Sequence, residues 1–268
     1  MSAEERFTFG GRACAWPPRP QKTEHVRLIS EAELRSWIVH EDDAVVVLNK
    51  PGDVVCHPSK AGPWSSLVGA VREGLHLESV HLVFRLDRET SGVVVIAKTP
   101  AMASRLQKAM QQRRVGKAYQ AILTGELREA VTVNQPLGDD TTSPVYIKTT
   151  VRLDGAAAVT HFEPVAIANG FTLARVVTET GRKHQIRAHA QWLGHSLVGD
   201  KIYGPDDRLY LEFIDTGWSE SMAAKLLLPR QALHCAEIDL RAAGLDRVFV
   251  APLADDMREF CVSRGLMS

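Results

Sequence analysis

The sequence predicts an α+β fold, in which a mixed, largely antiparallel β-sheet is covered by a few packed helices. Segments of β-type composition outnumber segments with helical periodicity, and most of them are joined by short polar turns. No internal repeat occurs along the 268 residues. This length fits one large domain, alone or with a small appendage, and is sufficient to bury a substantial core.

The N-terminal part differs in composition from the rest. Residues 11–24 are rich in Arg and Pro and predict an irregular lead-in. A short helix is expected over residues 31–37. We therefore expect residues 1–38 to form an N-terminal extension and residues 39–268 to form the main domain.

The first half of the main domain alternates strands and helices. Val45–Leu48 reads as a strand that ends in the turn Asn49-Lys50-Pro51-Gly52, and residues 64–75 have apolar side chains at helical spacing. Strands are expected over 81–86 and 93–97, around a polar loop. Thr99 and Pro100 suit the N-cap and first position of a helix, whose apolar face is Met102, Leu106 and Met110.

The second half continues with further strands. Residues 119–123, 171–177 and 231–240 have strand composition, and residues 184–193 are expected to start or form a helix. Residues 204–229 show no clear period, so we expect a long irregular insertion there.

The composition restricts the function classes. The chain is 45% hydrophobic and 24% charged, and 32 basic residues balance 32 acidic ones. A neutral total argues against an indiscriminate polyanion binder but allows one basic face. The four cysteines are widely spaced, which indicates neither a disulfide framework nor a zinc site and favours a reducing, cytoplasmic compartment. No secretory signal or membrane span is expected.

Asp87 is the first candidate for chemistry. It lies in the loop between two apolar strands, with Arg85 two residues before it and Arg88 directly after it. A carboxylate held beside cations stays ionised and can serve as a nucleophile or a base. The alternative is an Asp that caps the turn through a hydrogen bond to the backbone two or three residues on.

Two concentrations of positive charge stand out against the neutral total. One is the run from Lys98 to Lys117, which contains no acid; the other is Arg182, Lys183 and Arg187. Arg113, Arg114 and Lys117 are expected at the end of the helix that follows the loop. Phosphate contacts are a natural use of such patches, and a solvated helix face is the alternative.

Other site chemistries find little support. His184 and His189 are five residues apart, which does not place both rings on one helical face, and no carboxylate completes a metal-ligand set. We therefore expect no metal. The sequence contains neither a Gly-rich phosphate-binding loop nor a Gly-x-Ser-x-Gly elbow.

Several segments together resemble one enzyme family. The stretch Phe84-Arg85-Leu86-Asp87-Arg88-Glu89-Thr90-Ser91-Gly92 is similar to the catalytic motif of the RluA-type pseudouridine synthases. Further segments agree in order and spacing: Leu48–Gly52, Lys117-Ala118-Tyr119, Thr180–His189, Gly199–Gly204 and Leu233-His234. The resemblance covers roughly residues 39–240. It departs from the family at Phe84, where a His is usual, and in residues 1–38, which are too short and too Pro-rich for the S4 RNA-binding domain of many relatives.

The resemblance implies the pseudouridine synthase catalytic fold and an isomerase. Such an enzyme converts specific uridines of structured RNA to pseudouridine: the N-glycosidic bond breaks, the uracil turns over, and a C–C bond forms to its C5. Reactant and product are isomers, so no redox cofactor, nucleotide or metal is implied. The expected partner is RNA, either transfer RNA or ribosomal RNA. We expect a cytoplasmic monomer.

The resemblance also implies roles for single residues. Asp87 would be the essential carboxylate, acting on the ribose either as a nucleophile at C1′ or as a base at C2′. Arg187 would pair with Asp87, and Tyr119 would pack against the uracil and help to remove the C5 proton. Arg85 would fill the space left by the flipped nucleotide. Arg113, Arg114, Lys117, Arg182 and Lys183 would contact RNA phosphates.

Two alternatives stay open at the level of sequence. One is a catalytically silent RNA-binding protein on the same fold, against which the trio of Asp87, Tyr119 and Arg187 argues. The other is an aspartyl-nucleophile phosphotransferase. It would need a second carboxylate two residues after Asp87 and a magnesium site; Glu89 is present, but no further acidic cluster lies in a suitable loop.

Overall fold

The computed structural model describes residues 7–9, 12–14, 27–57 and 62–268. Most of the irregular lead-in expected over 11–24 therefore lies outside the described residues. Of the first 26 residues, the structure describes only the antiparallel pair β1 (Phe7–Phe9) and β2 (Arg12–Cys14).

The described residues alternate between strands and helices. The helices are α1 (Glu31–Trp37), η1 (Pro63–Ser65), α2 (Leu67–Gly74), α3 (Pro100–Gln111), α4 (Gln185–Trp192), α5 (Arg208–Thr216), α6 (Glu220–Leu226), η2 (Arg241–Ala243) and α7 (Asp255–Ser263). The remaining strands are β3 (Ile38–Glu41), β4 (Val45–Lys50), β5 (His81–Leu82), β6 (Ser91–Ala97), β7 (Gly116–Thr124), β8 (Val131–Asn134), β9 (Leu137–Asp139), β10 (Thr149–Val151), β11 (Val159–Ala168), β12 (Phe171–Thr178), β13 (Leu233–Asp239) and β14 (Val248–Val250).

One ten-stranded sheet forms the frame of the molecule. Its order is β3-β4-β6-β13-β7-β12-β11-β8, with β14 beside β13 and β5 beside β6. The pairing of β6 with β13 is parallel, and the other pairings of this sheet are antiparallel. The predicted mixed, largely antiparallel α+β fold is confirmed.

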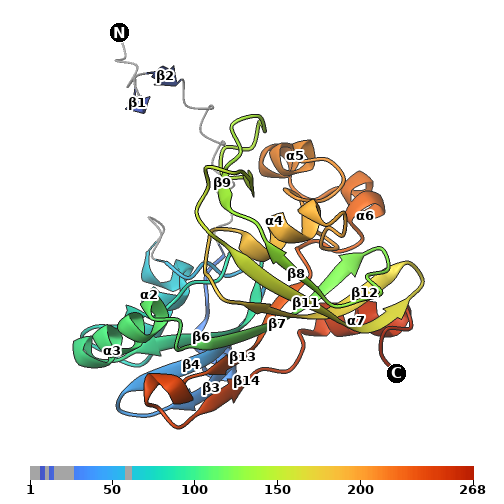
Figure 1. The fold of residues 1–268 in the computed structure, drawn as a ribbon. Coiled ribbons are helices and arrows are strands. Elements are labelled where there is room, and N and C mark those ends of the chain that lie inside the picture. The colour runs from blue at the N-terminus through green and yellow to red at the C-terminus, as the bar shows by residue number, and fades with distance from the viewer. Residues whose placement is uncertain (1–6, 10–11, 15–26, 58–61) are drawn as a thin grey trace.

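The sheet has two halves with different cover. Figure 1 shows α2 and α3 beside the half that contains β4 and β6, and α4, α5 and α6 grouped near the half that contains β8 and β11. The strand β6 is buried at all seven positions, as expected for a central strand covered on both faces. Because β6 and β13 lie in the middle of the sheet, the loop before β6 emerges between the two halves.

The core follows the alternation of strand side chains. Ala121 and Leu123 of β7 belong to the main core, whereas Ile122 between them joins a second cluster. In that cluster Leu173 of β12 meets Met257 and Phe260 of α7, so α7 covers the face of β7 and β12 opposite the main core.

Most elements expected from the sequence are present. The helix over 31–37, the strands at 45–48, 93–97 and 119–123 and the closing strand within 231–240 are confirmed. Thr99 caps α3 by accepting from the backbone N–H of Met102 at 3.2 Å, with Pro100 at the first position. Leu34 of α1 is fully buried in the main core, so the compact body begins before residue 39.

The expected irregular insertion at 204–229 is wrong, because it folds as α5 and α6. Leu209 and Phe213 lie four residues apart, as do Met222 and Leu226, and together they form a small apolar cluster. Gly217, with φ 81°, ends α5 and breaks the period between the two pairs. Two short helices separated by such a turn carry too few repeats for a clear helical signal.

Two other boundaries differ from expectation. The strand expected over 81–86 is only two residues long, and residues 83–90 form a loop. Helix α3 ends at Gln111, and Arg113 takes a left-handed conformation with φ 56°. Arg113 and Arg114 therefore follow the helix, and Lys117 belongs to β7.

Within the described part of the chain, no helix has the length and apolar character needed to cross a membrane.

Candidate active site

Asp87 lies in a tight turn of the loop between β5 and β6. The backbone N–H of Thr90 donates to the carbonyl of Asp87 at 3.1 Å, which closes the turn. Lys50, fully buried at the end of β4, donates to the carbonyl of Arg88 at 3.0 Å and to those of Pro51 and Val54. A buried ammonium thus fixes the backbone directly after Asp87.

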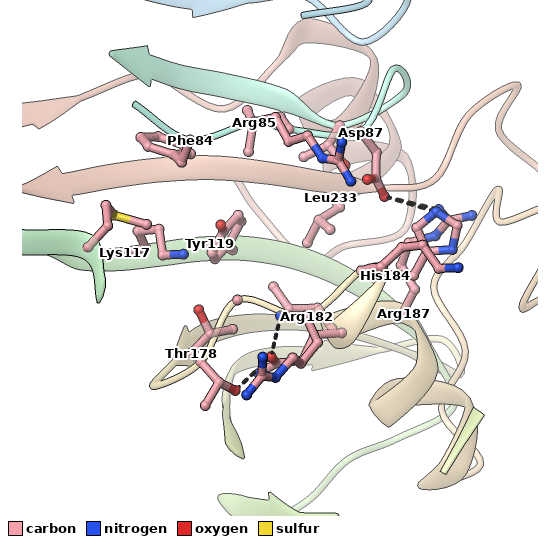
Figure 2. Close-up of a pocket in the computed structure, with 18 residues that line it drawn as sticks. Phe84, Arg85, Asp87, Lys117, Tyr119, Thr178, Arg182, His184, Arg187 and Leu233 are labelled. Atoms are coloured by element: carbon pink, nitrogen blue, oxygen red, sulfur yellow. Dashed lines mark hydrogen bonds and ion pairs between the residues drawn. The ribbon is translucent and has the colours of Figure 1, made fainter. Parts of the chain in front are cut away.

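The Asp87 carboxylate is held from two further elements. Nη1 of Arg187, in α4, donates to Oδ2 of Asp87 at 3.0 Å (Figure 2). Nε2 of Gln231, just before β13, lies 3.4 Å from the same oxygen and donates to Thr90 Oγ1 at 2.9 Å. The side chain of Asp87 is nevertheless 34% exposed, so the carboxylate is oriented but accessible.

Arg187 is shared between two carboxylates. Its Nε and Nη2 donate to the two oxygens of Asp200 at 2.6 and 2.8 Å, and Asp200 is fully buried. Burial opposes the charge on Arg187, but the nearby charge of Asp200 and its hydrogen bonds outweigh burial and raise the pKa of Arg187. Burial likewise opposes the charge on Asp200, but Arg187 lowers the pKa of Asp200 below its usual value. The cation beside Asp87 is therefore permanent.

His184 is the N-cap residue of α4 and also lies near Asp87. It has a left-handed backbone with φ 54° at the N-cap, and its Nδ1 lies 3.0 Å from the hydroxyl of Tyr203. Burial and the charge of Arg187 lower the pKa of His184 to about 4. At neutral pH the ring is uncharged, so its Nε2, 3.8 Å from Asp87, is not one half of an ion pair.

A pocket of about 320 Å³ opens beside Asp87, at the lower end of the range for small-ligand sites. Figure 2 shows Tyr119 on β7 between Lys117 and Leu233, with Phe84 above them. Tyr119 is 8% exposed, and burial raises the pKa of its phenol well above the usual value. The pocket therefore places an aromatic ring that carries a neutral hydroxyl beside the accessible carboxylate.

The structure brings most of the site residues predicted from the sequence into one pocket, but not all of them. Asp87, Tyr119 and Arg187 line this pocket, and so do four of the six predicted RNA-binding residues, namely Arg85, Lys117, Arg182 and Lys183. Lys183 pairs with Asp139 at 2.8 Å, and Nε of Arg182 donates to the carbonyl of Ala157 at 3.0 Å.

The other two predicted RNA-binding residues, Arg113 and Arg114, do not line the pocket. Both are exposed, and Nη1 of Arg114 donates to the carbonyl of Ala242 at 3.2 Å. Two other cations of the run from Lys98 to Lys117 also have partners within the protein: Lys98 pairs with Glu41, and Arg105 donates to the carbonyl of Ala243.

Sequence reasoning missed the supporting residues Asp200, Gln231 and Lys50. Asp200 occurs in the segment Gly199–Gly204 that carries the resemblance, but its partnership with Arg187 leaves no local pattern. The full burial of Asp200 and the left-handed backbone of Gly199 before it, with φ 78°, become visible only in the structure. Among the described residues, no three His, Cys, Asp or Glu side chains are grouped so that they could hold a metal ion.

Comparison with known proteins identifies the family of this chain. A sequence profile described as RNA pseudouridylate synthase matches residues 44–192. The chain is 36% identical over 229 residues to ribosomal large subunit pseudouridine synthase D of Vibrio vulnificus, covering 83% of this chain and 68% of that protein. The enzyme of the same name from Escherichia coli K12 is 33% identical over 232 residues, with the same coverage.

Solved structures agree with the sequence matches. The human protein named RNA pseudouridylate synthase domain containing 4 superposes with a TM-score of 0.67 at 26% identity, covering 87% of this chain and 94% of that chain. The human protein named RNA pseudouridylate synthase domain containing 1 superposes with a TM-score of 0.64 at 20% identity, covering 94% of this chain and 98% of that chain. This second likeness supports the fold.

Proposed function

Because this chain belongs to the RNA pseudouridylate synthase family and is an RNA pseudouridine synthase, we propose that Asp87 is its essential carboxylate and that its substrate is large-subunit ribosomal RNA. The observation that carries the assignment of Asp87 is the pair Asp87–Arg187 at the mouth of the pocket, where an accessible carboxylate meets a buried cation. A protein that only binds RNA has no need of an oriented anion at this point.

Asp87 acts on the ribose of the target uridine. The reaction breaks the bond between N1 of the base and C1′, turns the uracil over, and joins C5 to C1′; C5 loses a proton and N1 gains one. An ionised carboxylate at the pocket mouth can attack C1′ as a nucleophile or remove a proton from C2′ as a base. Arg187 keeps the carboxylate oriented in either case, because it is itself fixed by Asp200.

The pocket beyond Asp87 holds the uracil. The ring of Tyr119 forms one wall and packs against the base, and its hydroxyl takes part in the transfer of the C5 proton. Since burial keeps this phenol protonated, the hydroxyl can only relay a proton: it gives its own towards N1 of the turned uracil, which gains one in the net reaction, and takes the one that C5 loses. Arg85 lies at the rim, where it fills the space that the extruded nucleotide leaves in the RNA.

The domain assignment follows the packing. We assign catalysis to the body that begins at α1, because Leu34 is part of its core. From the proposed ribosomal RNA substrate we also infer a cytoplasmic enzyme.

Ribosomal RNA is chosen over transfer RNA because the bacterial relatives described above are ribosomal large subunit enzymes. The test is to map pseudouridines in total RNA from cells with the gene, without it, and with the Asp87→Asn variant. We expect one or a few pseudouridines of large-subunit ribosomal RNA to disappear in both altered strains. Loss confined to transfer RNA would show that the proposed substrate is wrong.

A further inference from the structure

A second pocket, of about 440 Å³, also borders the loop that carries Asp87, since Asp87, Arg88 and Glu89 line it. Asp87, His184 and Arg187 line both this pocket and the pocket of Tyr119. The two pockets therefore meet at the Asp87 carboxylate. Helix α5 and the turn after it, in the segment for which the sequence predicted no structure, supply one wall of the second pocket.

The wall formed by α5 is aromatic and apolar. Tyr210, Phe213 and Ile214 of α5 line the pocket, together with Trp218 and, from the chain before β10, Ile147. Ile147, Ile214 and Trp218 are each 38–39% exposed, and Tyr146, next to Ile147 in the chain, is 81% exposed. Apolar groups gathered at the rim of a hollow indicate a ligand-binding surface.

Two cations of this pocket, Lys201 and Arg230, are paired with carboxylates of the protein. Nζ of Lys201 lies 2.6 Å from Glu89, and Arg230 binds Asp256 at 2.6 Å. Lys201 also lies 4.4 Å from the centre of the Phe213 ring and 5.6 Å from that of Trp218, so it supports the aromatic wall from one side. Arg88 also lines the pocket; it is exposed and forms no ion pair among the described residues. A nucleotide here would therefore find one cation for its phosphate and aromatic rings on which its flat, uncharged base can stack.

We propose that this second pocket binds the base of a nucleotide that flanks the target uridine in the RNA. The inference rests on the proposed function, in which the ribose of the uridine lies at Asp87 and its uracil lies in the pocket of Tyr119. With the base on that side, the sugar-phosphate chain continues past Asp87 towards α5. A neighbouring base that leaves the RNA stack with the uridine then stacks on Trp218 and holds the backbone in place.

The test uses an RNA oligonucleotide centred on the uridine found by pseudouridine mapping, with tritium at its C5. Dissociation constants and single-turnover tritium release are measured for the wild type, Trp218→Ala, Trp218→Phe and Trp192→Ala. Trp192 is a matched control, because it is 52% exposed and does not line either pocket. Ile214→Ala is a second probe of the pocket that does not touch the turn after α5.

Loss of one stacked base weakens binding about tenfold. We expect this loss for Trp218→Ala, a smaller one for Ile214→Ala, and near wild-type affinity for Trp218→Phe and Trp192→Ala. At saturating RNA, the rate of tritium release changes less than about threefold, because Trp218 touches no reacting atom. If thermal unfolding shows that Trp218→Ala does not fold, the comparison of Ile214→Ala with Trp192→Ala decides.

A second measurement identifies the ligand as a base. Abasic residues are placed one at a time at the positions flanking the uridine. One such position should weaken binding to the wild type about tenfold and have no further effect on Trp218→Ala. If every abasic position adds its full effect in the variant, or if Trp218→Ala binds like the wild type, the inference is overturned while the proposed function stands. A wild type that releases no tritium overturns both.

Discussion

Nη1 of Arg187 lies 3.0 Å from Oδ2 of Asp87, and the two side chains differ sharply in exposure: 5% for Arg187 and 34% for Asp87. The cation is buried and bound on its other side by Asp200. The anion faces the pocket. The protein therefore fixes Arg187, and Arg187 in turn orients the accessible carboxylate that we propose acts on the substrate.

Replacing Arg187 by Met should damage both stability and catalysis. The change leaves Asp200 buried without its cation, which lowers the free energy of unfolding by about 3–5 kcal/mol. It also removes the partner of Asp87, and we expect single-turnover tritium release to fall by about 10²–10³-fold. Binding of RNA should weaken far less than this rate.

The double variant Arg187→Met with Asp200→Asn separates the two effects. It removes the unpaired buried charge, so denaturant unfolding should recover much of the lost stability while tritium release stays slow. If the rate recovers together with stability, Arg187 supports the fold only. A tenfold loss of RNA affinity with normal turnover of bound RNA would instead make it a phosphate contact.

Tyr119→Phe should separate binding from proton transfer. The ring that packs against the uracil is kept, so RNA affinity should stay within about threefold of the wild type. The hydroxyl is lost, and release of the C5 hydrogen should slow by about 10²–10⁴-fold, the usual contribution of a proton-transfer group. Tyr119→Leu is expected to lose affinity as well. Equal rates for Tyr119→Phe and the wild type would limit Tyr119 to packing.

The lowered pKa of His184 predicts that the stability of the fold depends on pH. Its pKa is lowered to about 4 in the folded chain, by burial first, against about 6.5 in an unfolded chain. Between these values the unfolded chain binds more protons, so the free energy of unfolding falls as the pH falls from about 6.5 towards 4. The stabilisation is fully present above about pH 6.5.

Between about pH 7 and pH 4.5, the His184→Asn variant should lose less unfolding free energy than the wild type, by on the order of 2 kcal/mol. Asn tolerates the left-handed backbone at this position, so the fold should be retained. His234, whose pKa is also lowered to about 4, chiefly by burial, keeps part of the slope in the variant. Urea unfolding at the two pH values measures the difference, and parallel curves for variant and wild type would refute the assignment.

Arg113 and Arg114 test the extent of the RNA surface. If both contact phosphates, replacing both by Gln should reduce the salt dependence of binding by a slope of about 0.7–0.9 for each lost contact. Affinity should fall alike for matched and mismatched RNA, because phosphate contacts carry no sequence information. Single-turnover chemistry at saturating RNA should change little. A titration of RNA binding against salt measures the slope.

Arg128→Gln is the control for this titration, since its side chain is 80% exposed and lies outside the pocket of Tyr119. An unchanged slope for the Arg113 and Arg114 double variant would mean that both belong to a solvated surface. The main role of Arg114 would then be its hydrogen bond to the carbonyl of Ala242.

The sequence predicted three residues that line one pocket, but not the contacts that hold them in place. Asp87, Tyr119 and Arg187 are recognisable because each lies in a segment with a distinctive local pattern. Gln231 reaches Asp87 from 144 positions along the chain, and Asp200 reaches Arg187 from 13. The first contact is created by the sheet order, which brings β13 beside β6, and the second by the turn that follows α4; no local spacing encodes either one.

The same limit explains the misjudged fold elements. Strands β4 and β6 are runs of Val and Ile that only a buried strand explains well. Helices α5 and α6 are short, and their stability comes from contacts between Leu209, Met222 and Leu226 across a turn. The segment that sequence reasoning left irregular thus forms the aromatic wall beside Asp87.

The most direct test of the account is the activity of the Asp87→Asn variant. Its amide is nearly isosteric with the carboxylate but is neither an anionic nucleophile nor a strong base, so we expect the fold and most RNA affinity to be kept while tritium release from C5-labelled uridine RNA is abolished. The measurement is single-turnover release at saturating RNA, with thermal unfolding and RNA binding as controls. Turnover close to that of the wild type would contradict the role of Asp87 and, with it, the mechanism proposed for this protein.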